Sequence, residues 1–315
     1  MKIAIIGAGA MGCLYGGYLS QHNDVILIDS NPAQVDAINT HGITVEQTNG
    51  ERTHYKKVRA CLSSQCQDAV DLVIVFVKSY YTQAALESNT ALFKSSPYVM
   101  TLQNGAGNDK KISQFVPKEK VIIGTTTNNV VTLAGSHISH SNNGSTTIGS
   151  NYGETEILSK ISATLNESGF EVIISDDIQR IIWSKIFINL SINCFTALLQ
   201  TPIGYMVQNK YAWNFAKRLV YEAVEVAEAD GTYFDRREVL NSVKDVCIQA
   251  SKGYSSMYQD RKRHVLMEID AINGAIVEQA KQYGVPTPYN AIIVDLIHAV
   301  EGTYNLGDEE LPVIV

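Results

Sequence analysis

Residues 2–12 read Lys2-Ile3-Ala4-Ile5-Ile6-Gly7-Ala8-Gly9-Ala10-Met11-Gly12 and decide the fold of the first half of the chain. A short apolar run, rich in β-branched residues, leads directly into a G-x-G-x-x-G motif. Its first glycine permits a tight strand-to-helix turn, its second lets the backbone approach a pyrophosphate, and its third lets the helix pack close to the sheet. The free N–H groups at the start of that helix would bind the diphosphate. The stretch therefore predicts a dinucleotide-binding Rossmann domain in which Gly7, Ala8, Gly9, Ala10, Met11 and Gly12 contact the cofactor.

A second apolar strand ends at Asp29, 22 residues after Gly7. A carboxylate at this place can accept hydrogen bonds from both hydroxyls of the adenosine ribose. A 2′-phosphate would instead need a cationic partner, yet residues 29–36 contain two acids and neither Arg nor Lys. The sequence thus predicts NAD as the cofactor and disfavours NADP.

The composition is that of a globular protein, because 45% of the 315 residues are hydrophobic and 18% are charged. This length allows two ordinary domains. A net charge of −7 gives no general attraction for nucleic acid or for an anionic membrane. The five cysteines are scattered and lack the spacing of metal ligands, so we expect no metal site and a reducing, cytoplasmic location.

Two uncharged stretches need a separate interpretation. Ile3 to Gln21 has the length of a signal peptide, but five glycines interrupt it and the dinucleotide motif explains it better. Residues 186–209 carry no charge and are long enough to span a bilayer, but they include amides, a proline and a glycine. We interpret them as a buried helix followed by a turn and expect no membrane segment.

The first half of the sequence alternates strand and helix patterns, which predicts a parallel sheet. The expected strands are 2–6, 24–28, 71–77, 98–102 and 120–124, and the expected helices are 10–21, 31–40, 80–93 and 108–115. Residues 71–77 are apolar at nearly every position, as in a central strand covered on both faces. Residues 43–60 suggest a hairpin, and residues 130–150 suggest a second, irregular β section.

The pattern changes after Gly169. A strand at 170–174 precedes helical periodicity over 176–199, 211–230, 236–250, 256–283 and 288–302. The sequence therefore predicts an α/β fold, with an N-terminal Rossmann parallel sheet and an all-helical C-terminal domain. We place the dinucleotide-binding domain at 1–170 and the substrate and catalytic domain at 171–315.

Three polar residues of the expected helix 176–199 are spaced by four and share one face: Lys185, Asn189 and Asn193. Such groups are expensive to bury without partners. The face either meets solvent at a helix edge or faces a ligand cleft, with Lys185 as proton donor and the amides as hydrogen-bonding groups.

A second polar cluster includes Ser255, Ser256 and, further on, Glu268 within a mainly apolar helical pattern. Glu268 is either a solvated surface acid or a carboxylate held at the ligand site; periodicity alone leaves both open. His264 is expected four residues earlier on the same face. The basic run of residues 261–264 fits a solvated helix face better than a nucleic-acid site, because the chain is acidic overall.

Polar residues also follow two neighbouring strands: Lys78 comes after the expected strand 71–77, and Gln103-Asn104-Gly105 after 98–102. A lysine in this place is often only a solvated strand end. Open α/β sheets, however, bind ligands at the carboxyl ends of their strands, which favours a functional interpretation.

Together these residues resemble the ketopantoate reductase (2-dehydropantoate 2-reductase) family over nearly the whole chain. The resemblance lies in the following residues: Gly7 to Gly12, Lys78, Gln103-Asn104-Gly105, Gly124-Thr125-Thr126-Thr127, Trp183-Ser184-Lys185, Asn189, Asn193, Ser255-Ser256-Met257 and Glu268-Ile269-Asp270-Ala271-Ile272-Asn273-Gly274. It implies a Rossmann domain plus a helical domain, hydride transfer to a 2-oxo acid that yields the (R)-2-hydroxy acid, and a homodimer.

The resemblance also implies roles for single residues. Lys185 takes the place of the general acid, and Glu268 that of a carboxylate near cofactor and substrate. The substrate-contacting positions correspond to Asn104, Lys185, Asn189, Asn193 and Ser256. The cofactor-contacting positions beyond the glycine motif and Asp29 correspond to Lys78, Asn104, Val130 and Glu268.

Two departures from the family pattern bear on cofactor and substrate. Ketopantoate reductases usually use NADPH and carry a basic residue near the position of Asp29. Many also carry an Asn where this chain has Ile203, and an apolar residue suits a branched or aromatic side chain better than a terminal hydroxyl. Both departures favour an NAD-dependent D-2-hydroxyacid dehydrogenase. The alternatives are a 2-dehydropantoate 2-reductase that uses NADPH and a non-catalytic nucleotide-sensing protein.

Overall fold

The computed structural model describes residues 1–152 and 155–305, which divide into two compact units. The first unit comprises residues 1–103 and 107–181, and the second comprises residues 104–106 and the chain from residue 182 onward. This division falls eleven residues later than the boundary at 170/171 expected from the sequence. The difference arises because the strand over 171–174 pairs with the main sheet of the first unit.

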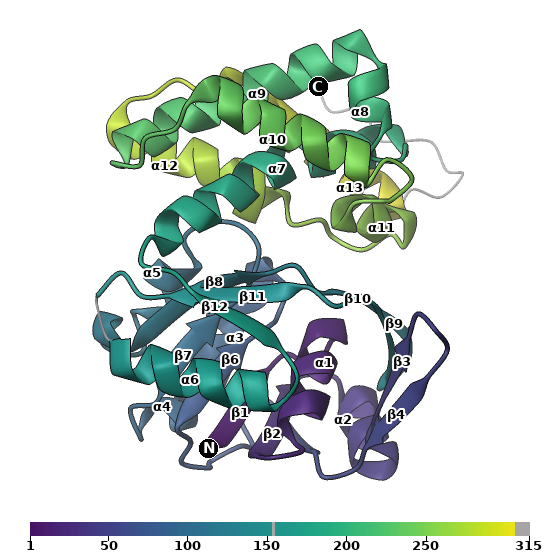
Figure 1. Ribbon diagram of the computed structural model, residues 1–315, viewed down its shortest axis with the longest axis vertical. Helices are drawn as coiled ribbons and strands as arrows, with labels where there is room; N and C mark the ends of the chain where they lie inside the picture. The colour runs from purple at the N-terminus through teal and green to yellow at the C-terminus, as the bar shows by residue number, and fades with distance from the viewer. Residues whose placement is uncertain (153–154, 306–315) are drawn as a thin grey trace. The chain divides into compact units, whose positions relative to one another are not determined.

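The first unit is built on an eight-stranded sheet with the order β12-β11-β8-β7-β6-β1-β2-β5 (Figure 1). Its strands are β1 (Lys2–Ile6), β2 (Asp24–Asp29), β5 (Arg59–Leu62), β6 (Leu72–Val75), β7 (Tyr98–Thr101), β8 (Val121–Thr126), β11 (Ser145–Gly149) and β12 (Glu171–Ile174). Neighbours run parallel except β8 and β11, which are antiparallel. β6 is buried at all four positions, as expected for a central strand with both faces covered.

The helical segments of this unit are α1 (Ala10–Leu19), α2 (Pro32–His41), η1 (Ser79–Tyr81), α3 (Thr82–Ser88), α4 (Thr90–Phe93), α5 (Asn108–Ile112), η2 (Lys118–Lys120) and α6 (Thr155–Glu167). The helix expected over 80–93 is interrupted at Asn89, whose side chain donates to the carbonyl of Ala85 and ends α3. α6 was not expected from the sequence; it packs against β12 (Figure 1).

A smaller four-stranded sheet has the order β4-β3-β10-β9. It consists of β3 (Ile43–Gln47), β4 (Arg52–Tyr55), β9 (Asn129–Ala134) and β10 (His137–Asn142). The β3–β4 hairpin confirms the first part of the hairpin expected over 43–60. Residues 59–62 depart from it, because they pair with β2 as an edge strand of the main sheet.

The described residues of the second unit form helices and no strand. They are α7 (Ile178–Leu199), α8 (Tyr205–Gln208), α9 (Lys210–Ala229), α10 (Arg236–Gln249), α11 (Ser256–Lys262), η3 (Asp270–Gly274), α12 (Ala275–Tyr283), α13 (Pro288–Gly302) and η4 (Thr303–Asn305). α7 begins in the first unit and passes into the second at residue 182. The predicted fold class is confirmed: a mostly parallel sheet precedes a helical domain.

The long helix expected over 256–283 is wrong in its middle. The chain leaves the α-helix after Lys262, and residues 263–268 lie outside any helix before the π-helical turn η3. His264 has a φ of 54°, a left-handed conformation that no continuous α-helix contains. His264 and Glu268 therefore do not share a helix face, and the His264 ring stacks instead on Tyr304, with 5.0 Å between ring centroids.

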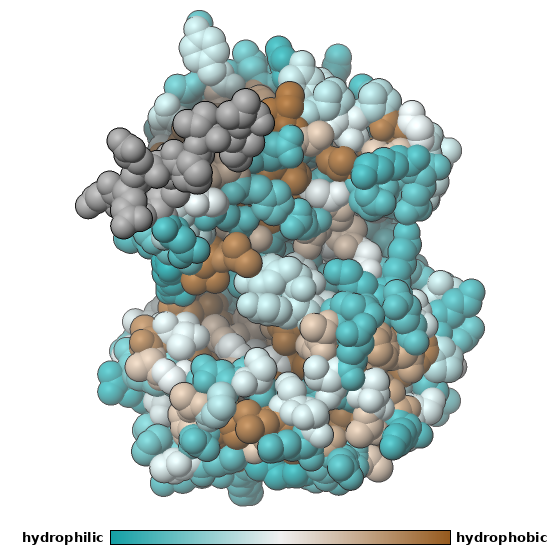
Figure 2. All heavy atoms as spheres, turned by 180° about the vertical axis from the view of Figure 1, so that it is seen from behind, coloured by the Kyte–Doolittle hydropathy of each residue, from teal (hydrophilic) through white to brown (hydrophobic). Residues whose placement is uncertain are grey.

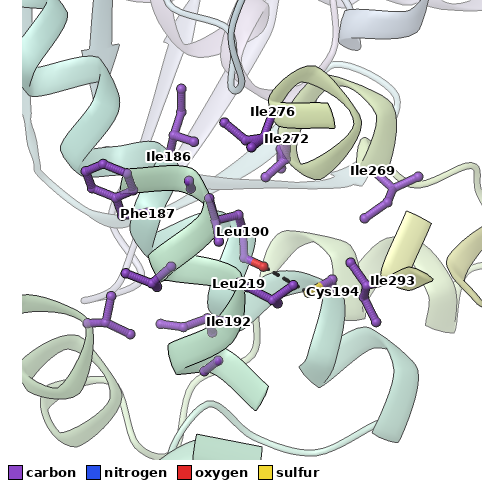
Figure 3. Packing of buried hydrophobic residues seen from close by; sticks show 14 of the residues in the cluster. Ile186, Phe187, Leu190, Ile192, Cys194, Leu219, Ile269, Ile272, Ile276 and Ile293 are labelled. Atoms are coloured by element: carbon purple, nitrogen blue, oxygen red, sulfur yellow. Dashed lines mark hydrogen bonds between the residues drawn. The ribbon is translucent and has the colours of Figure 1, made fainter. Parts of the chain in front are cut away.

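α7 runs through the hydrophobic core of the second unit. Figure 3 shows Ile186, Phe187, Leu190 and Cys194 of α7 packed with isoleucines of η3, α12 and α13.

α7 is the one helix in the described part of the chain that is long and apolar enough to cross a membrane. More than half of its most apolar window, 56%, is buried, and the core helices of soluble proteins pass the same test. The expected buried helix followed by a turn is confirmed. On the face drawn in Figure 2, hydrophobic residues are interspersed with hydrophilic ones.

Candidate functional site

The glycine motif forms the turn between β1 and α1. Gly7 has a φ of 101°, and a Cβ built on it would lie 2.7 Å from the backbone nitrogen of Val77. A Cβ on Gly12 would lie 1.8 Å from the carbonyl oxygen of Gly7. The fold itself therefore requires these two glycines. Gly9 is different: a Cβ on it would meet nothing within 4 Å, so this glycine leaves space at the start of α1.

The carboxylate of Asp29 holds this loop from the end of β2. Its Oδ2 accepts a 2.7 Å hydrogen bond from the backbone N–H of Ala8, and its Oδ1 accepts one of 2.9 Å from Asn31. Gln34 of α2 donates from Nε2 to the Ala8 carbonyl at 2.7 Å. Among the described residues no side chain caps the start of α1, so the N–H groups of its first turn can bind an anion.

These features fit a dinucleotide. The open side of Gly9 and the uncapped helix start suit a diphosphate, and a half-buried carboxylate at the end of β2 suits a ribose diol. Lys78 begins η1, next to Val77, whose backbone passes beside Gly7. Val130 of β9 packs with Ala10 and Met11 against the core of the first unit. The glycine motif, Asp29 and the backbone at Lys78 thus lie around one loop, while Val130 lies on β9, a strand that contacts α1.

Gln103 has a structural role at the ends of β6 and β7. Its Nε2 donates to the carbonyl of Val77 at 2.6 Å and to the hydroxyl of Thr82 at 2.8 Å, while its Oε1 accepts from Thr101. Asn104, the next residue, already belongs to the second unit. The Gln103-Asn104-Gly105 stretch is therefore divided between an anchoring residue and a candidate ligand-binding residue.

The polar face of α7 that consists of Lys185, Asn189 and Asn193, here called the polar stripe, is largely buried. Lys185 and Asn189 are half-buried, and Asn193 is 7% exposed, so the alternative of a solvated helix edge is not supported. Burial lowers the pKa of Lys185 to about 8, although the negative charge of Glu268 raises it. An ammonium with a pKa near neutrality is suited to proton transfer. The position of the three residues on one helix face follows from their spacing of four.

Glu268 is buried, with 8% of its surface exposed, and lies just before η3. Glu268 is therefore a buried carboxylate and not the solvated surface acid that the sequence also allowed. Glu301 of α13, whose side chain is 9% exposed, accepts a 2.6 Å hydrogen bond from the backbone N–H of Met267. The imidazole of His298 lies between two carboxylates: Nδ1 is 2.8 Å from Oε2 of Glu301, and Nε2 is 2.9 Å from Oδ1 of Asp270. Glu301 thus holds the backbone just before Glu268, and His298 links Glu301 to the side chain of Asp270 just after it. The sequence alone indicated no role for these three residues.

Burial opposes the protonated form of His298, but the hydrogen bonds to Asp270 and Glu301 outweigh it and raise the pKa of this imidazole. A charged His298 between two carboxylates strengthens the bridge. We refer to Glu301, His298 and Asp270 as the Glu268 clamp. Glu301 lies 33 residues after Glu268 in the sequence, so no local pattern could have revealed this contact.

Asn104 is fixed to the same turn. The N–H of Ala106 donates to the carbonyl of Ala271 at 3.1 Å, and a Cβ on Gly105 would lie 2.0 Å from that oxygen. Ser256 is exposed at the first position of α11, whereas Ser255 is buried, caps α11 and hydrogen-bonds Thr196 at 2.7 Å. The second unit thus contains six of the expected site residues: Asn104, Lys185, Asn189, Asn193, Ser256 and Glu268.

A buried amide network also supports α7 and was not anticipated. Asn273 of η3 donates to the carbonyl of Leu190 at 3.1 Å and to Asn290 at 3.0 Å, and Asn290 donates to Glu222 at 2.7 Å. Leu190 lies between Asn189 and Asn193, so this network fixes η3 against the segment of α7 that carries the stripe.

Arg261 corrects the interpretation of the basic run. Its guanidinium donates at 2.5 Å to the carbonyls of Ala197 and Leu198. These carbonyls belong to the last turn of α7, where orphan acceptors and the helix dipole favour a cation. Arg261 is therefore a helix cap, while Lys262, Arg263 and His264 are exposed as expected.

Comparison with protein families covers both units. The model described as ketopantoate reductase PanE/ApbA matches residues 3–153, and the one described as its C-terminal domain matches residues 177–301. The chain belongs to the ketopantoate reductase family. Members of this family are NAD(P)-dependent oxidoreductases that act on a CH–OH group, and this chain is one of them. The resemblance seen in the sequence is thereby confirmed.

Individual relatives carry two kinds of name. The 2-dehydropantoate 2-reductase of Pyrococcus abyssi is 33% identical over 302 residues, covering 96% of this chain and 98% of its own length. That of Streptococcus pyogenes serotype M1 is 29% identical over 310 residues, covering 97% of this chain and all of its own. The solved structure of a D-mandelate dehydrogenase with NADH and anilino(oxo)acetate is 34% identical, with a TM-score of 0.90 over 97% of this chain and 100% of that one.

Proposed function

We propose that this protein is an NAD(H)-dependent D-2-hydroxyacid dehydrogenase that reduces a branched or aromatic 2-oxo acid to the (R)-2-hydroxy acid. The observation that carries the proposal is the half-buried Lys185, whose pKa of about 8 results from burial opposed by the charge of Glu268. A lysine in this state can give up its proton at physiological pH.

The chain's own residues divide the work of the reaction. The ammonium of Lys185 faces the oxygen of the 2-oxo group, stabilises the negative charge that develops there and donates the proton. The amides of Asn189, Asn193 and Asn104 and the hydroxyl of Ser256 hold the substrate carboxylate. Glu268 keeps Lys185 protonated and orders the site for cofactor and substrate. A bound nicotinamide supplies the hydride.

The cofactor proposal rests on Asp29. Its carboxylate accepts the ribose hydroxyls and repels a 2′-phosphate, and residues 29–36 provide no cation to offset that repulsion. Within the first unit, Gly7 to Gly12 bind the diphosphate and Lys78 and Val130 are further cofactor contacts. Within the second unit, the proposed cofactor contacts are Asn104 and Glu268. In keeping with NAD, the similar D-mandelate dehydrogenase is described with NADH.

The substrate proposal rests on Ile203. This apolar side chain packs against the core of the second unit, and its backbone N–H pairs with the carbonyl of Gly253 at 3.0 Å. An apolar residue here favours an aliphatic or aromatic substituent over the terminal hydroxyl of ketopantoate. We also propose a homodimer, which light scattering of the purified protein would test.

Two other functions compete with this proposal. The names of the curated relatives favour a 2-dehydropantoate 2-reductase that uses NADPH. A nucleotide-sensing protein without turnover is disfavoured, because a sensor has no need to hold a lysine and a carboxylate in a buried site.

The deciding experiment measures kcat/KM with NADH and with NADPH against four acids: ketopantoate, 2-oxoisocaproate, 2-oxoisovalerate and phenylglyoxylate. We expect NADH together with phenylglyoxylate or a branched acid to give the highest values. A preference for NADPH and ketopantoate would support the 2-dehydropantoate 2-reductase instead. Cofactor binding without reduction of any of these acids would point to a substrate outside these four.

A further inference from the structure

Cys61 and Cys66 form a thiol pair at one edge of the main sheet. Cys61 is half-buried on β5, the edge strand, and Cys66 is 3% exposed after a short turn. The turn is tight, because the N–H of Gln65 donates to the carbonyl of Leu62 at 3.1 Å and Ser64 has a φ of 70°. Cys61 and Cys66 flank this hydrogen-bonded turn, so the two residues stand opposite each other at its base.

Charged groups surround this pair. The Cys66 sulfur lies 3.5 Å from Oδ2 of Asp68, and both oxygens of that carboxylate are bound by Arg59, at 3.2 and 3.3 Å. Lys2 binds Asp68 at 2.9 Å. The neighbouring Cys61 thiol lowers the pKa of Cys66 to about 7, against the opposing effect of burial. Cys66 therefore ionises more readily than an ordinary cysteine.

The turn between the two cysteines is bonded to the backbone of Asp29. Leu62 pairs with Asp29 in the sheet, and the N–H of Ser63 donates to the Asp29 carbonyl at 3.0 Å. The side chain of Asp29 in turn holds Ala8 of the glycine loop. A change in the shape of residues 61–66 is therefore transmitted to the residue that we assign to the adenosine ribose.

We propose that Cys61 and Cys66 form a reversible disulfide on reaction with a peroxide, and that this modification weakens binding of the dinucleotide through Asp29. The effect on the dinucleotide rests on the proposed function, whereas formation of the disulfide does not. Disulfides in reducing compartments are typically transient and redox-sensing. This site belongs to that class.

The oxidation balances with hydrogen peroxide as the two-electron oxidant. The Cys66 thiolate attacks one peroxide oxygen, the O–O bond breaks, and the departing hydroxide takes up a proton as water. The Cys61 sulfur then attacks the sulfenic sulfur of Cys66. The S–S bond forms, the S–O bond breaks, and a second water leaves with the proton of Cys61. A dithiol reductant reverses the reaction.

A disulfide imposes its own geometry on the turn. It fixes the two sulfurs about 2.05 Å apart and the Cβ atoms about 3.8 Å apart. Residues 62–65 must adapt to this geometry, and the N–H of Ser63 that binds Asp29 lies within them. We expect the Kd for NADH to rise about fivefold or more, the lower range of a typical coupling between sites. Once NADH is saturating, kcat is unchanged.

The test treats the full-length protein with hydrogen peroxide and follows two readouts. Peptide mass spectrometry identifies the Cys61–Cys66 crosslink, and NADH fluorescence titration gives the Kd before oxidation, after it, and after dithiothreitol. The Cys61→Ser and Cys66→Ser variants should form no intramolecular crosslink and should keep their NADH affinity under peroxide. Cys247→Ser, which removes a buried thiol of the other unit, is the matched control and should respond like the wild type.

Absence of the crosslink in the wild type would overturn the proposal. So would a peroxide-induced loss of NADH affinity that persists in Cys61→Ser and Cys66→Ser, or a crosslink that leaves the Kd unchanged. Both readouts are independent of substrate turnover. If the protein bound NADH but reduced no 2-oxo acid, the proposed function would fail while the disulfide could still be demonstrated.

Discussion

The backbone N–H of Ala8 donates a 2.7 Å hydrogen bond to the carboxylate of Asp29. This carboxylate therefore fixes the glycine loop, and it is also the group that we propose as the partner of the adenosine ribose. Its other oxygen accepts from the N–H of Asn31 at the start of α2. Experiments on cofactor choice must separate the charge of Asp29 from its hydrogen bonds.

Asp29→Asn removes the charge and keeps an acceptor for Ala8. We expect the preference for NADH over NADPH, as a ratio of kcat/KM values, to fall by about tenfold, or roughly 1.4 kcal/mol. The exposed Asp36→Asn, seven residues further on, is the control and should leave the ratio unchanged. Equal use of NADH and NADPH by the wild type would contradict the role of Asp29 in selection.

Lys185→Ala removes the proposed general acid. We expect kcat for 2-oxo acid reduction to fall by about 10²–10⁴-fold, the usual range for loss of a general acid. Loss of the ammonium leaves the buried Glu268 without its opposing charge, so the variant should be somewhat less stable than the wild type but still folded. Thermal unfolding would check this. Lys252→Ala, an exposed lysine of the same unit, should behave as the wild type. Near-normal turnover by Lys185→Ala would exclude the assignment.

The pH dependence follows from the pKa of Lys185, which burial lowers to about 8. Reduction requires the protonated lysine, so kcat/KM for the 2-oxo acid should decrease as the pH rises through about 8. Oxidation of the hydroxy acid requires the neutral amine and should increase over the same interval. In Glu268→Gln the charge that raises this pKa is lost, so both profiles should shift to lower pH. Profiles that did not move in Glu268→Gln would show that Glu268 acts in another way.

Glu301→Gln tests the Glu268 clamp. The amide can still accept from Met267 but loses the charged bridge to His298, so the backbone around Glu268 is held less firmly. We expect kcat to fall by about tenfold, or roughly 1.4 kcal/mol, with little change in the KM for NADH. Glu278→Gln, which removes an exposed carboxylate of α12, is the control. An unchanged kcat in Glu301→Gln would limit the clamp to a purely structural role.

Ile203→Asn tests substrate choice. An amide at this position should raise kcat/KM for ketopantoate relative to phenylglyoxylate by about tenfold, as expected when one polar contact replaces an apolar one. Ile248→Asn changes an exposed isoleucine of α10 in the same way and should leave the ratio unaltered. A ratio that is the same in Ile203→Asn and wild type would show that this residue does not contact the substrate.

Several elements could be predicted because they depend on local signals. β1, α1 and β2 follow from an apolar run, a glycine motif and a second apolar run, and they lie within two residues of the expected bounds. α7, α9, α10 and α13 follow from helical periodicity. The errors lie where tertiary contacts override the local pattern. Residues 59–62 join β2 instead of the hairpin, and residues 263–268 leave the helix to reach η3.

In the candidate site, too, local sequence predicted some features, whereas others depended on tertiary contacts. The spacing of Lys185, Asn189 and Asn193 placed them on one helix face without a structure. Their burial could not be read from that spacing, and neither could the choice between a solvated and a buried Glu268. Both depend on packing between α7 and the segment around η3, which is far away in the sequence.

The sequence by itself determined the dinucleotide loop, the strand-and-helix alternation, the polar face of α7 and the family. These follow from short spacings, because glycine conformations and helix periodicity act over a few residues. Chain folding alone brings Glu301 to the backbone N–H of Met267, with His298 beside it, places Arg261 at the end of α7, and sets the turn between Cys61 and Cys66 against Asp29. These contacts join residues that are distant in the chain or lie on opposite sides of a turn, and only chain folding brings such groups within hydrogen-bonding distance.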